Sequence, residues 1–286
     1  MKGRVQTGLT VFMVSVWWLP VAYLALLSVA GPWKSDHVFP DSMSWTRWVR
    51  ILSGGNGDLI KTTMASLVLA TVVSVVSTTC GFITSKAVAE SRWRGEWLAL
   101  SHLAFGFSPV ILGSCLSFIA IRMGLSGTFL GVAMVQIAVT SAFATVLLVP
   151  VWTSERRALQ SVARTLGARP VQIWRLILWP SCRPLVMVCW AQTFFFSWMQ
   201  YGLTLTIGAG KVHTLPLEVY DFVFEADLGY AAVASLILII PPMLLLMMSP
   251  SARPAWQNQG RASEAATNAE RHVKARREEG NLPDAP

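Results

Sequence analysis

Long stretches without any charged side chain alternate with short charged segments along this chain. The uncharged intervals are residues 5–33, 62–85, 97–121, 123–154, 184–210 and 228–252. Each is long enough for the roughly 20 apolar residues of helix that cross a bilayer core about 30 Å thick. The pattern therefore predicts six transmembrane helices, over residues 8–30, 60–85, 97–121, 127–151, 184–207 and 229–248.

Composition agrees with this pattern. Hydrophobic residues make up 53% of the sequence and charged residues only 13%, a balance that neither soluble globular domains nor disordered chains show. We expect an all-α integral membrane protein with one six-helix unit over residues 1–252. The remaining segment, residues 253–286, mixes basic and acidic residues with few large apolar ones, so we expect a disordered tail.

The positions of Lys and Arg indicate how the chain crosses the membrane. If both termini lie on one side, that side holds 17 of the 23 basic residues, whereas the acidic residues divide almost evenly, eight against seven. The positive-inside rule then places both termini in the cytoplasm. Residues 31–59 and 208–228 become outer loops, and residues 153–183 become a cytoplasmic loop. The net charge of +8 thus reflects membrane topology rather than a nucleic-acid partner.

The start of the chain and its cysteines need separate consideration. The first span ends in Ser28-Val29-Ala30, which is similar to a signal-peptidase site, but its apolar stretch exceeds the roughly 7 to 15 residues of a signal core. We therefore expect the span to be retained. The 4 cysteines form no C-x-x-C pair, so we expect packing residues and no metal site.

Catalytic and energy-converting groups are missing from the predicted spans. None of the spans contains Asp, Glu, Lys or Arg, so no proton relay is expected. His102 and Ser108 lie six residues apart, which is not a one-face spacing, so no catalytic dyad is expected. Gly208-Ala-Gly210-Lys211 lacks the first glycine of a phosphate-binding loop. ATP must therefore bind elsewhere.

The cytoplasmic loop 153–183 has the most regular pattern. Leu159, Val162, Ala163 and Leu166 recur at i, i+3, i+4 and i+7, which predicts an amphipathic helix from Ser154 to Leu166. Such a basic amphipathic helix can lie on anionic lipid or bind a protein, and these residues alone do not decide between the two.

A turn and a second helix should follow in the same loop. Gly167 stands where a C-terminal cap belongs, and Pro170 stands where a new helix can begin. This second helix would carry Val171, Trp174 and Leu178 on one face and end at Pro180.

The segment from Ser161 to Pro180 resembles the loop of permease subunits in bacterial ABC importers. The family pattern is E-A-A, three residues, G, nine residues, I-x-L-P, and it is matched at Ala163, Gly167, Ile177 and Pro180. Ser161, Val162 and Trp179 replace the Glu, an Ala and the Leu. Residues 192–220, with Gln200-Tyr201-Gly202 and Thr214-Leu215-Pro216-Leu217, are also similar to the fifth-span region of this family. The similarity is greatest to the polyamine, thiamine, ferric iron and oxyanion importer group.

This resemblance implies a type I ABC importer permease fold and a location in the bacterial inner membrane. The chain would form half of a translocation pore with a second permease subunit, homologous or identical, and a periplasmic solute-binding protein would deliver the solute. ATP and Mg would be held by a separate, dimeric ATP-binding subunit, so this chain itself would bind no cofactor and catalyse no reaction. The residues expected to couple the two proteins are Ser161, Ala163, Arg164, Gly167, Ala168, Pro170, Ile177 and Pro180. The alternative is a six-span membrane scaffold or assembly factor that transports nothing.

Polar residues mark one face of the expected fifth span. Thr193, Ser197, Gln200 and Thr204 fall within about 60° on a helical wheel of 100° per residue, and Gln136 and Thr140 are i, i+4 neighbours on the fourth span. Such groups either line a pathway or hydrogen-bond a neighbouring helix. Because the resemblance places the fifth span at the centre of the pathway, we expect these six residues to line it.

Acidic residues gather in the outer loop 208–228. They are Glu218, Asp221, Glu225 and Asp227. They either contact a solute-binding protein or form a solvated face, and the sequence leaves both interpretations open.

Overall fold

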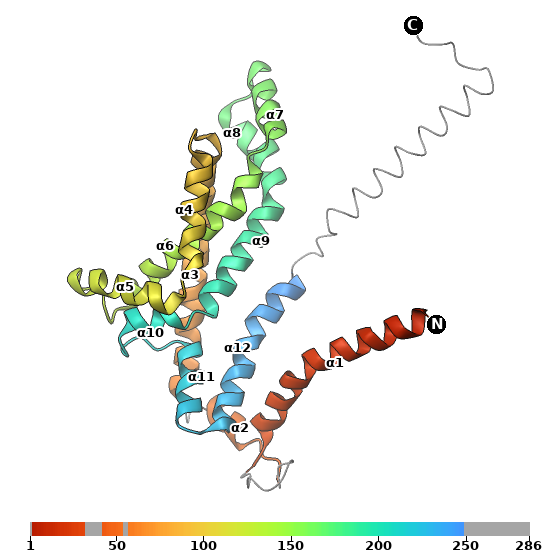
Figure 1. Ribbon diagram of the computed structural model, residues 1–286, viewed down its shortest axis with the longest axis vertical. Coiled ribbons are helices and arrows are strands. Elements are labelled where there is room, and N and C mark those ends of the chain that lie inside the picture. The colour runs from red at the N-terminus through yellow and green to blue at the C-terminus, as the bar shows by residue number, and fades with distance from the viewer. Residues whose placement is uncertain (1, 32–41, 54–56, 249–286) are drawn as a thin grey trace, which may run out of the picture. The chain divides into compact units, whose positions relative to one another are not determined.

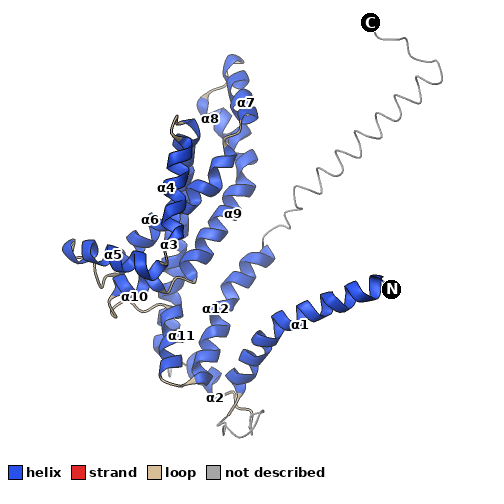
Figure 2. Cartoon of the chain, in the orientation of Figure 1, coloured by secondary structure: helices blue, strands red, loops and turns tan. Residues whose placement is uncertain are grey.

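The computed structural model describes residues 2–31, 42–53 and 57–248 of the 286-residue chain. In this part of the chain the regular elements are helices (Figures 1 and 2), and one isolated β-bridge joins Ala30 and Met43. The predicted all-α class is confirmed. The chain divides into a unit of Met1–Met243 and a unit of Leu244–Pro286, whose described part is the end of the last helix. The predicted tail, residues 253–286, lies outside the described residues.

The helices follow one another with short connections. The first half contains α1 (Lys2–Val29), α2 (Thr46–Leu52), α3 (Gly57–Glu90), α4 (Arg94–Gly106), α5 (Pro109–Arg122), α6 (Phe129–Leu148) and the 3₁₀ turn η1 (Val149–Val151). The second half contains α7 (Ser154–Thr165), α8 (Pro170–Ile173), the π-helical segment η2 (Trp174–Leu178), α9 (Trp179–Trp198), α10 (Gly202–Gly208), α11 (Leu215–Phe224) and α12 (Leu228–Met248).

Several described helices have the length and apolar character of membrane spans. Three qualify on their own: Leu59–Glu90, Phe129–Val151 and Leu228–Leu245. The pair Arg94–Ala104 and Pro109–Arg122 would be a fourth span if its two halves, bent by 96°, are counted together. Within α1, Trp18–Val29 is a shorter apolar stretch. The chain is thus a multi-pass membrane protein, and the number of six spans stays a prediction.

The expected third span is broken in the middle. Phe107 and Ser108 between α4 and α5 have extended backbones, with ψ of 142° and 135°. A residue that precedes proline is kept out of the helical region by the proline ring, and Pro109 is favoured at the first position of a new helix. The prediction of one continuous helix over 97–121 is therefore wrong, and Pro109 is the reason.

The expected fifth span is broken as well, at residues 199–201 between α9 and α10. Gly202, which follows this break, lies so close to α5 that a Cβ there would be 2.8 Å from Val110 Cγ2 and 2.9 Å from Val110 N. The prediction of one continuous helix over 184–207 is wrong, because α10 packs closely along α5 rather than continuing α9. The two helix breaks therefore lie against each other.

The centre of the fold is the packing of α3 on α6, the most extensive contact between helices in the described chain. Gly81 makes this close approach possible, since a Cβ there would lie 2.4 Å from Ala144 Cβ. Val73 and Ala144 are fully buried. Small residues allow helix backbones in a membrane to come this close, and van der Waals packing then holds them together.

Two hydrogen bonds fix loops to opposite ends of α3. The backbone N–H of Leu215, which opens α11, donates to Ser66 Oγ at 2.7 Å. The indole N–H of Trp152, which precedes the loop 153–183, donates to Ser85 Oγ at 2.9 Å. From Ser66 to Ser85 an α-helix rises by about 28 Å at 1.5 Å per residue, close to the roughly 30 Å of a bilayer core.

Candidate functional site

The loop 153–183, called the coupling loop below after the role predicted for it, begins with the predicted amphipathic helix. α7 covers Ser154–Thr165, and Thr153 caps its start by accepting a hydrogen bond from the Arg156 N–H at 3.4 Å. The apolar positions that define the pattern are largely exposed: Leu159 by 56%, Val162 by 55% and Leu166 by 81%. The helix was predicted correctly, but the described residues leave most of its apolar face uncovered.

Gly167 ends α7 in the left-handed conformation, with φ of +80°. Its N–H donates to Arg164 O, and the N–H of Ala168 donates to Ala163 O, both at 3.0 Å, which are the two bonds of a Schellman cap. The predicted cap at Gly167 is confirmed. No described atom lies within 4 Å of the place that a Cβ on Gly167 would take, so backbone handedness rather than crowding favours glycine here.

The second helix of the loop begins at Pro170 as predicted but does not end at Pro180. Trp179 N–H donates to Trp174 O, five residues back, so η2 is a π-helical turn that leads directly into α9. In a regular helix Pro180 would lack its hydrogen bond and collide with the carbonyl of Leu176. We attribute the continuation to the wider turn just before Pro180, and the prediction that the helix ends there is wrong.

The exposed and buried sides of this second helix also differ from the prediction. Val171 is 73% exposed and Trp174 is 40% exposed, whereas Ile173 and Leu178 are buried. Ile173 and Leu178 belong to an apolar cluster with Trp152 at the base of the loop. Of the expected face, Leu178 is therefore buried, Trp174 is partly exposed with its ring against Phe82, and Val171 is exposed.

An arginine that the sequence pattern did not single out holds the base of the loop together. Arg156 Nη1 donates to Val151 O at 2.8 Å, and Nη2 donates to Ser181 O at 3.3 Å. These bonds join the start of α7 to the first turn of α9. The only feature of the sequence that sets Arg156 apart is its position as the first arginine after the fourth span. That position does not show which backbone oxygens accept its hydrogen bonds.

The eight predicted coupling residues occupy two environments. Exposed are Ser161, Arg164, Gly167, Pro170 and Pro180, and half-buried are Ala163, Ala168 and Ile177. Ala163 and Ala168 pack against the apolar cluster that contains Trp152. Ala163 and Ala168 thus face the inside of the loop, and the turn at Gly167 faces outward.

The predicted pathway residues form a buried hydrogen-bond network instead of an exposed surface. Gln136 lies at its centre: its Oε1 accepts from Ser197 Oγ at 2.6 Å, and its Nε2 donates to Thr204 Oγ1 at 3.2 Å. Thr140 Oγ1 donates to the backbone oxygen of Gln136 at 2.7 Å and is hydrogen bonded to Ser77 of α3. We call these five residues the polar network.

Thr193 is also buried and hydrogen bonded to a neighbouring helix. It is fully buried, and its hydroxyl is 3.1 Å from that of Thr78 on α3. Gln136, Thr140, Thr193 and Thr204 are 0% exposed, and each is hydrogen bonded to another described residue, so none of them offers a free polar group to a solute. For these residues and Ser197 the geometry favours the helix-joining interpretation.

Gln200 differs from the other five predicted pathway residues. It is 6% exposed and lies in the break between α9 and α10. Its Nε2 has no hydrogen-bond partner within the described residues. Buried polar groups are normally hydrogen bonded, so this amide is a donor without an acceptor in the described part of the chain.

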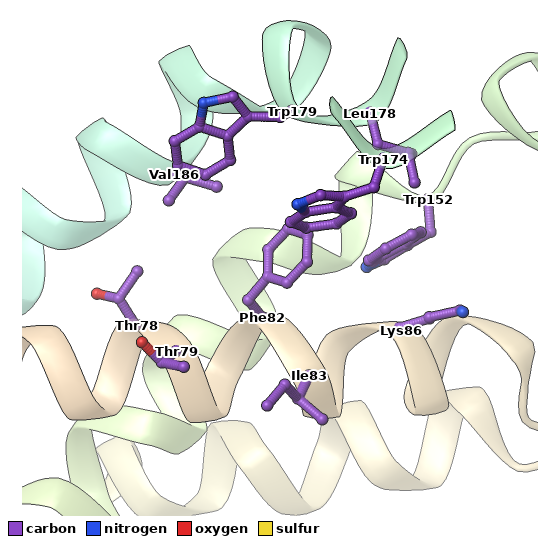
Figure 3. Close-up of a pocket in the computed structure, with 10 residues that line it drawn as sticks. All are labelled: Thr78, Thr79, Phe82, Ile83, Lys86, Trp152, Trp174, Leu178, Trp179 and Val186. Atoms are coloured by element: carbon purple, nitrogen blue, oxygen red, sulfur yellow. The ribbon is translucent and has the colours of Figure 1, made fainter. Parts of the chain in front are cut away.

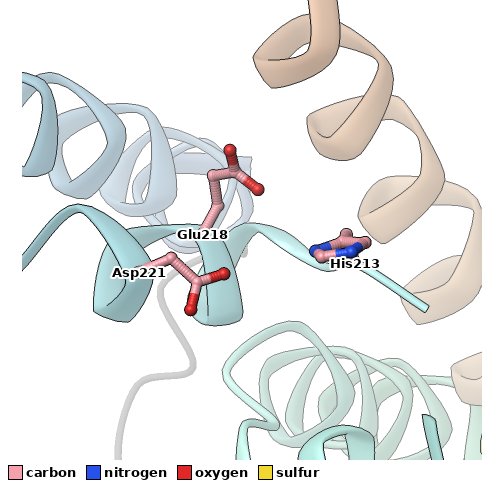
Figure 4. A group of neighbouring side chains, drawn as sticks. All are labelled: His213, Glu218 and Asp221. Carbon is pink, nitrogen blue, oxygen red and sulfur yellow. The ribbon is translucent and has the colours of Figure 1, made fainter. Parts of the chain in front are cut away.

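A second group of polar side chains lies at the start of α11. His213, Glu218 and Asp221 each place one nitrogen or oxygen atom within 4.8 Å of the others (Figure 4). His213 and Asp221 are exposed and Glu218 is half-buried. The two carboxylates were predicted as part of an acidic outer loop, whereas His213 was not, because α11 itself was not predicted. Exposed groups of this kind are common without a bound ion, so we assign no metal here.

Comparisons with known proteins show what this chain is similar to. No family model matches it. The molybdenum transport system permease protein ModB of Mycobacterium tuberculosis is 30% identical over 214 residues, which cover 68% of this chain and 76% of ModB. PhnV of Salmonella typhimurium, a permease protein named for 2-aminoethylphosphonate transport, is 23% identical over 252 residues, or 86% of this chain and 93% of PhnV.

The fold is also similar to a solved structure. A chain of the bacterial ABC transporter involved in the import of alginate superposes with a TM-score of 0.64 at 18% identity, covering 86% of this chain and 93% of that chain. The apolar helices and the similarity to ModB together define a membrane permease of a transport system. The chain belongs to the family of ABC importer permeases, as the pattern around Gly167 predicts. Its relatives are transport proteins rather than enzymes.

Proposed function

We propose that this chain is the transmembrane permease subunit of an ATP-driven importer in a bacterial inner membrane. It forms half of the pore beside a second permease subunit and is coupled to a separate ATPase through the coupling loop. The observation that carries the proposal is the exposed apolar face of α7. Leu159, Val162 and Leu166 lie together on one exposed face, and contiguous exposed apolar patches mark surfaces that bind a protein or a membrane.

The loop is built to transmit a movement. η2 joins α8 to α9, so helix continues from residue 170 to residue 198. Arg156 ties the start of α7 to the first turn of α9. A displacement of the docked α7 would therefore be passed to α9 as a rigid-body motion rather than absorbed by a flexible linker. Ser161 stands where the family pattern has a glutamate, so docking here rests on the apolar face and the arginines.

We place the translocation path at the two helix breaks. Interrupted helices at membrane depth are tolerated only where they are buried in protein or line a cavity, and transporters use such breaks for binding sites. Gln200 supplies a buried amide donor at one break, and Gly202 brings the other break into contact with it. The polar network then positions the path by holding α6 and α9 together.

We propose six spans with both termini in the cytoplasm. The bias of basic residues supports this topology. The separation of about 28 Å along α3 between the contacts of α11 and the coupling loop supports it independently. The acidic α11 would then face the periplasm, where a solute-binding protein can reach Glu218, Asp221 and Glu225.

The solute is proposed only as a class. The relatives include permease proteins named for molybdenum, 2-aminoethylphosphonate, trehalose, and spermidine and putrescine. A small solute of the polyamine, thiamine, ferric iron or oxyanion kind, handed over by a periplasmic binding protein, fits an uncharged path that imposes little selectivity.

Co-purification tests the function. A tagged chain from its native membrane should bring down a protein with ATPase activity, and Gly167→Trp should leave membrane insertion intact but abolish uptake. A chain that inserts normally and carries only lipid would support the scaffold alternative instead.

A further inference from the structure

An apolar cavity lies at the base of the coupling loop, between α3 and the segment that runs from Trp174 into α9. Its volume is about 540 Å³, within the roughly 300–1,000 Å³ of sites that hold small ligands. Figure 3 shows Phe82, Trp174 and Trp152 on one side of it, Trp179 on another, and Lys86 on the same helix as Phe82.

The aromatic side chains form the walls. The ring of Phe82 lies 5.3 Å from that of Trp152 and 5.5 Å from that of Trp174, measured between centroids. Trp174 is 40% exposed, Trp179 is 45% exposed, and Ile83 on the rim is 66% exposed. This cluster leaves a large apolar surface open at the end of a membrane-spanning helix.

One cation stands beside this apolar surface. Lys86 lies one turn beyond Phe82 on α3, and its Nζ is 5.8 Å from the centroid of the Trp152 ring. None of the described residues that line the cavity carries a carboxylate. The hydroxyl of Thr78 is hydrogen bonded to that of Thr193, and the indole N–H of Trp152 donates a hydrogen bond to Ser85. The cavity therefore offers apolar contact and one positive charge.

We infer that this cavity binds an anionic glycerophospholipid, with an acyl chain against the tryptophans and the phosphate beside Lys86. The inference rests on the proposed function for the topology that places Lys86 at the cytoplasmic leaflet, where anionic lipids are concentrated. Tryptophan and lysine are the side chains that anchor proteins at this depth.

A second copy of the chain fits less well. Its predicted spans contain no Asp or Glu, so a packed helix could cover the tryptophans but could not neutralise Lys86. A lipid supplies both the apolar chain and the negative charge.

The position of the cavity gives the lipid a role in coupling. Trp174 belongs to η2, which joins the coupling loop to α9, and its ring contacts Phe82 of α3. A lipid that fills the cavity would hold η2 against α3. Anionic lipid should therefore regulate how strongly the movement of the coupling loop is passed to α9.

The test uses the full-length permease, purified with any bound partners into nanodiscs of phosphatidylcholine with trace photoreactive phosphatidylglycerol. Labelling should map to the peptides that contain Ile83 and Trp179, and unlabelled phosphatidylglycerol should compete for it. Lys86→Gln should lower the labelling about fivefold, the effect expected of one cation near an anionic lipid surface. Arg94→Gln, an exposed arginine on the same predicted side of the membrane, should change it less than about twofold. Ile83→Trp should block the cavity and lower labelling without removing any charge.

Equal labelling of wild type and Lys86→Gln would overturn the inference, and so would equal competition by phosphatidylcholine. A cross-link from Ile83→Cys to a second permease chain in place of the lipid would overturn it in favour of a subunit contact. The lipid readout needs no ATPase: if labelling depends on Lys86 but no ATPase co-purifies, the proposed function fails while the lipid site stands.

Discussion

The coupling loop and the polar network were both singled out by the spacing of residues, yet the structure treats them in opposite ways. In the loop, Leu159 and Leu166 remain exposed. In the network, the side-chain amide of Gln136 is satisfied by Ser197 and Thr204 of the same chain. An exposed apolar face leaves a surface that a partner can cover, whereas a satisfied group has already found its partner. We therefore propose that the loop is the surface that another protein covers, and that the network is part of what holds this chain together.

The largest effect is expected from a charge on the exposed apolar face. Leu166→Asp should reduce association with the ATPase at least about thirtyfold, the cost of about 2 kcal/mol expected for a hot-spot residue. The permease itself should fold normally, since Leu166 is 81% exposed. The retained ATPase per permease after affinity purification measures this effect. Phe224→Asp, at an 80% exposed residue of α11, is the matched control and should retain the ATPase.

The second largest effect is expected on the stability of the permease, when Gln136 is replaced. Gln136→Leu removes both the acceptor for Ser197 and the donor to Thr204, and should lower the free energy of unfolding by about 1–3 kcal/mol. Thermal unfolding in detergent measures this loss. Gln192→Leu, on an exposed position of the same helix α9 as Ser197, should stay within about 0.5 kcal/mol of wild type. Equal losses in the two variants would show that the polar network does not join the helices.

A smaller effect is expected from backbone strain at the turn of the loop. Gly167→Val should cost about 1–2 kcal/mol in the left-handed conformation, whereas Gly167→Asn should be tolerated. Solute taken up per ATP hydrolysed should fall in the valine variant. Gly124 has a similar φ of +67° and equally open surroundings, so Gly124→Val carries the same strain at the turn between α5 and α6. If Gly124→Val uncouples as strongly, strain at Gly167 is not specific to coupling.

The smallest change in stability is expected when Gln200 is replaced. Because its Nε2 has no partner in the described chain, Gln200→Leu should change the free energy of unfolding by less than about 0.5 kcal/mol. Initial rates of uptake in vesicles should nevertheless fall, since the amide is proposed to face the path. A stability loss as large as that of Gln136→Leu would place Gln200 in the network instead.

Local rules in the sequence were sufficient for the coupling loop. The i, i+3, i+4 spacing and the glycine at its end predicted α7 and its cap, because both depend on residues within one or two turns. The same rules wrongly predicted a helix end at Pro180. A π-helical turn lets the helix continue there, and no residue pattern predicted that turn. They also missed Arg156, whose acceptors include a carbonyl 25 residues away.

The interior was harder to predict for a different reason. Charge-free intervals show that a segment can lie in a membrane, but they do not show where its helix is interrupted, as at Ser108 and at residues 199–201. A helical wheel places Ser197 and Thr204 on one face without showing that Gln136 meets them there. Pro109 is a local signal for the break at Ser108. The break at residues 199–201 and the meeting of Gln136 with Ser197 and Thr204 depend instead on which helices pack together, and that information is distributed over the whole chain.

One measurement tests the docking of the coupling loop most directly. A photo-crosslinking amino acid placed at position 166 of the permease, in its native membrane with the ATPase present, should form a cross-link to the ATPase in high yield, and the same group at position 224 should not. Cross-links from position 166 to lipid alone, or the same yield from both positions, would contradict the claim that the coupling loop is where the ATPase binds.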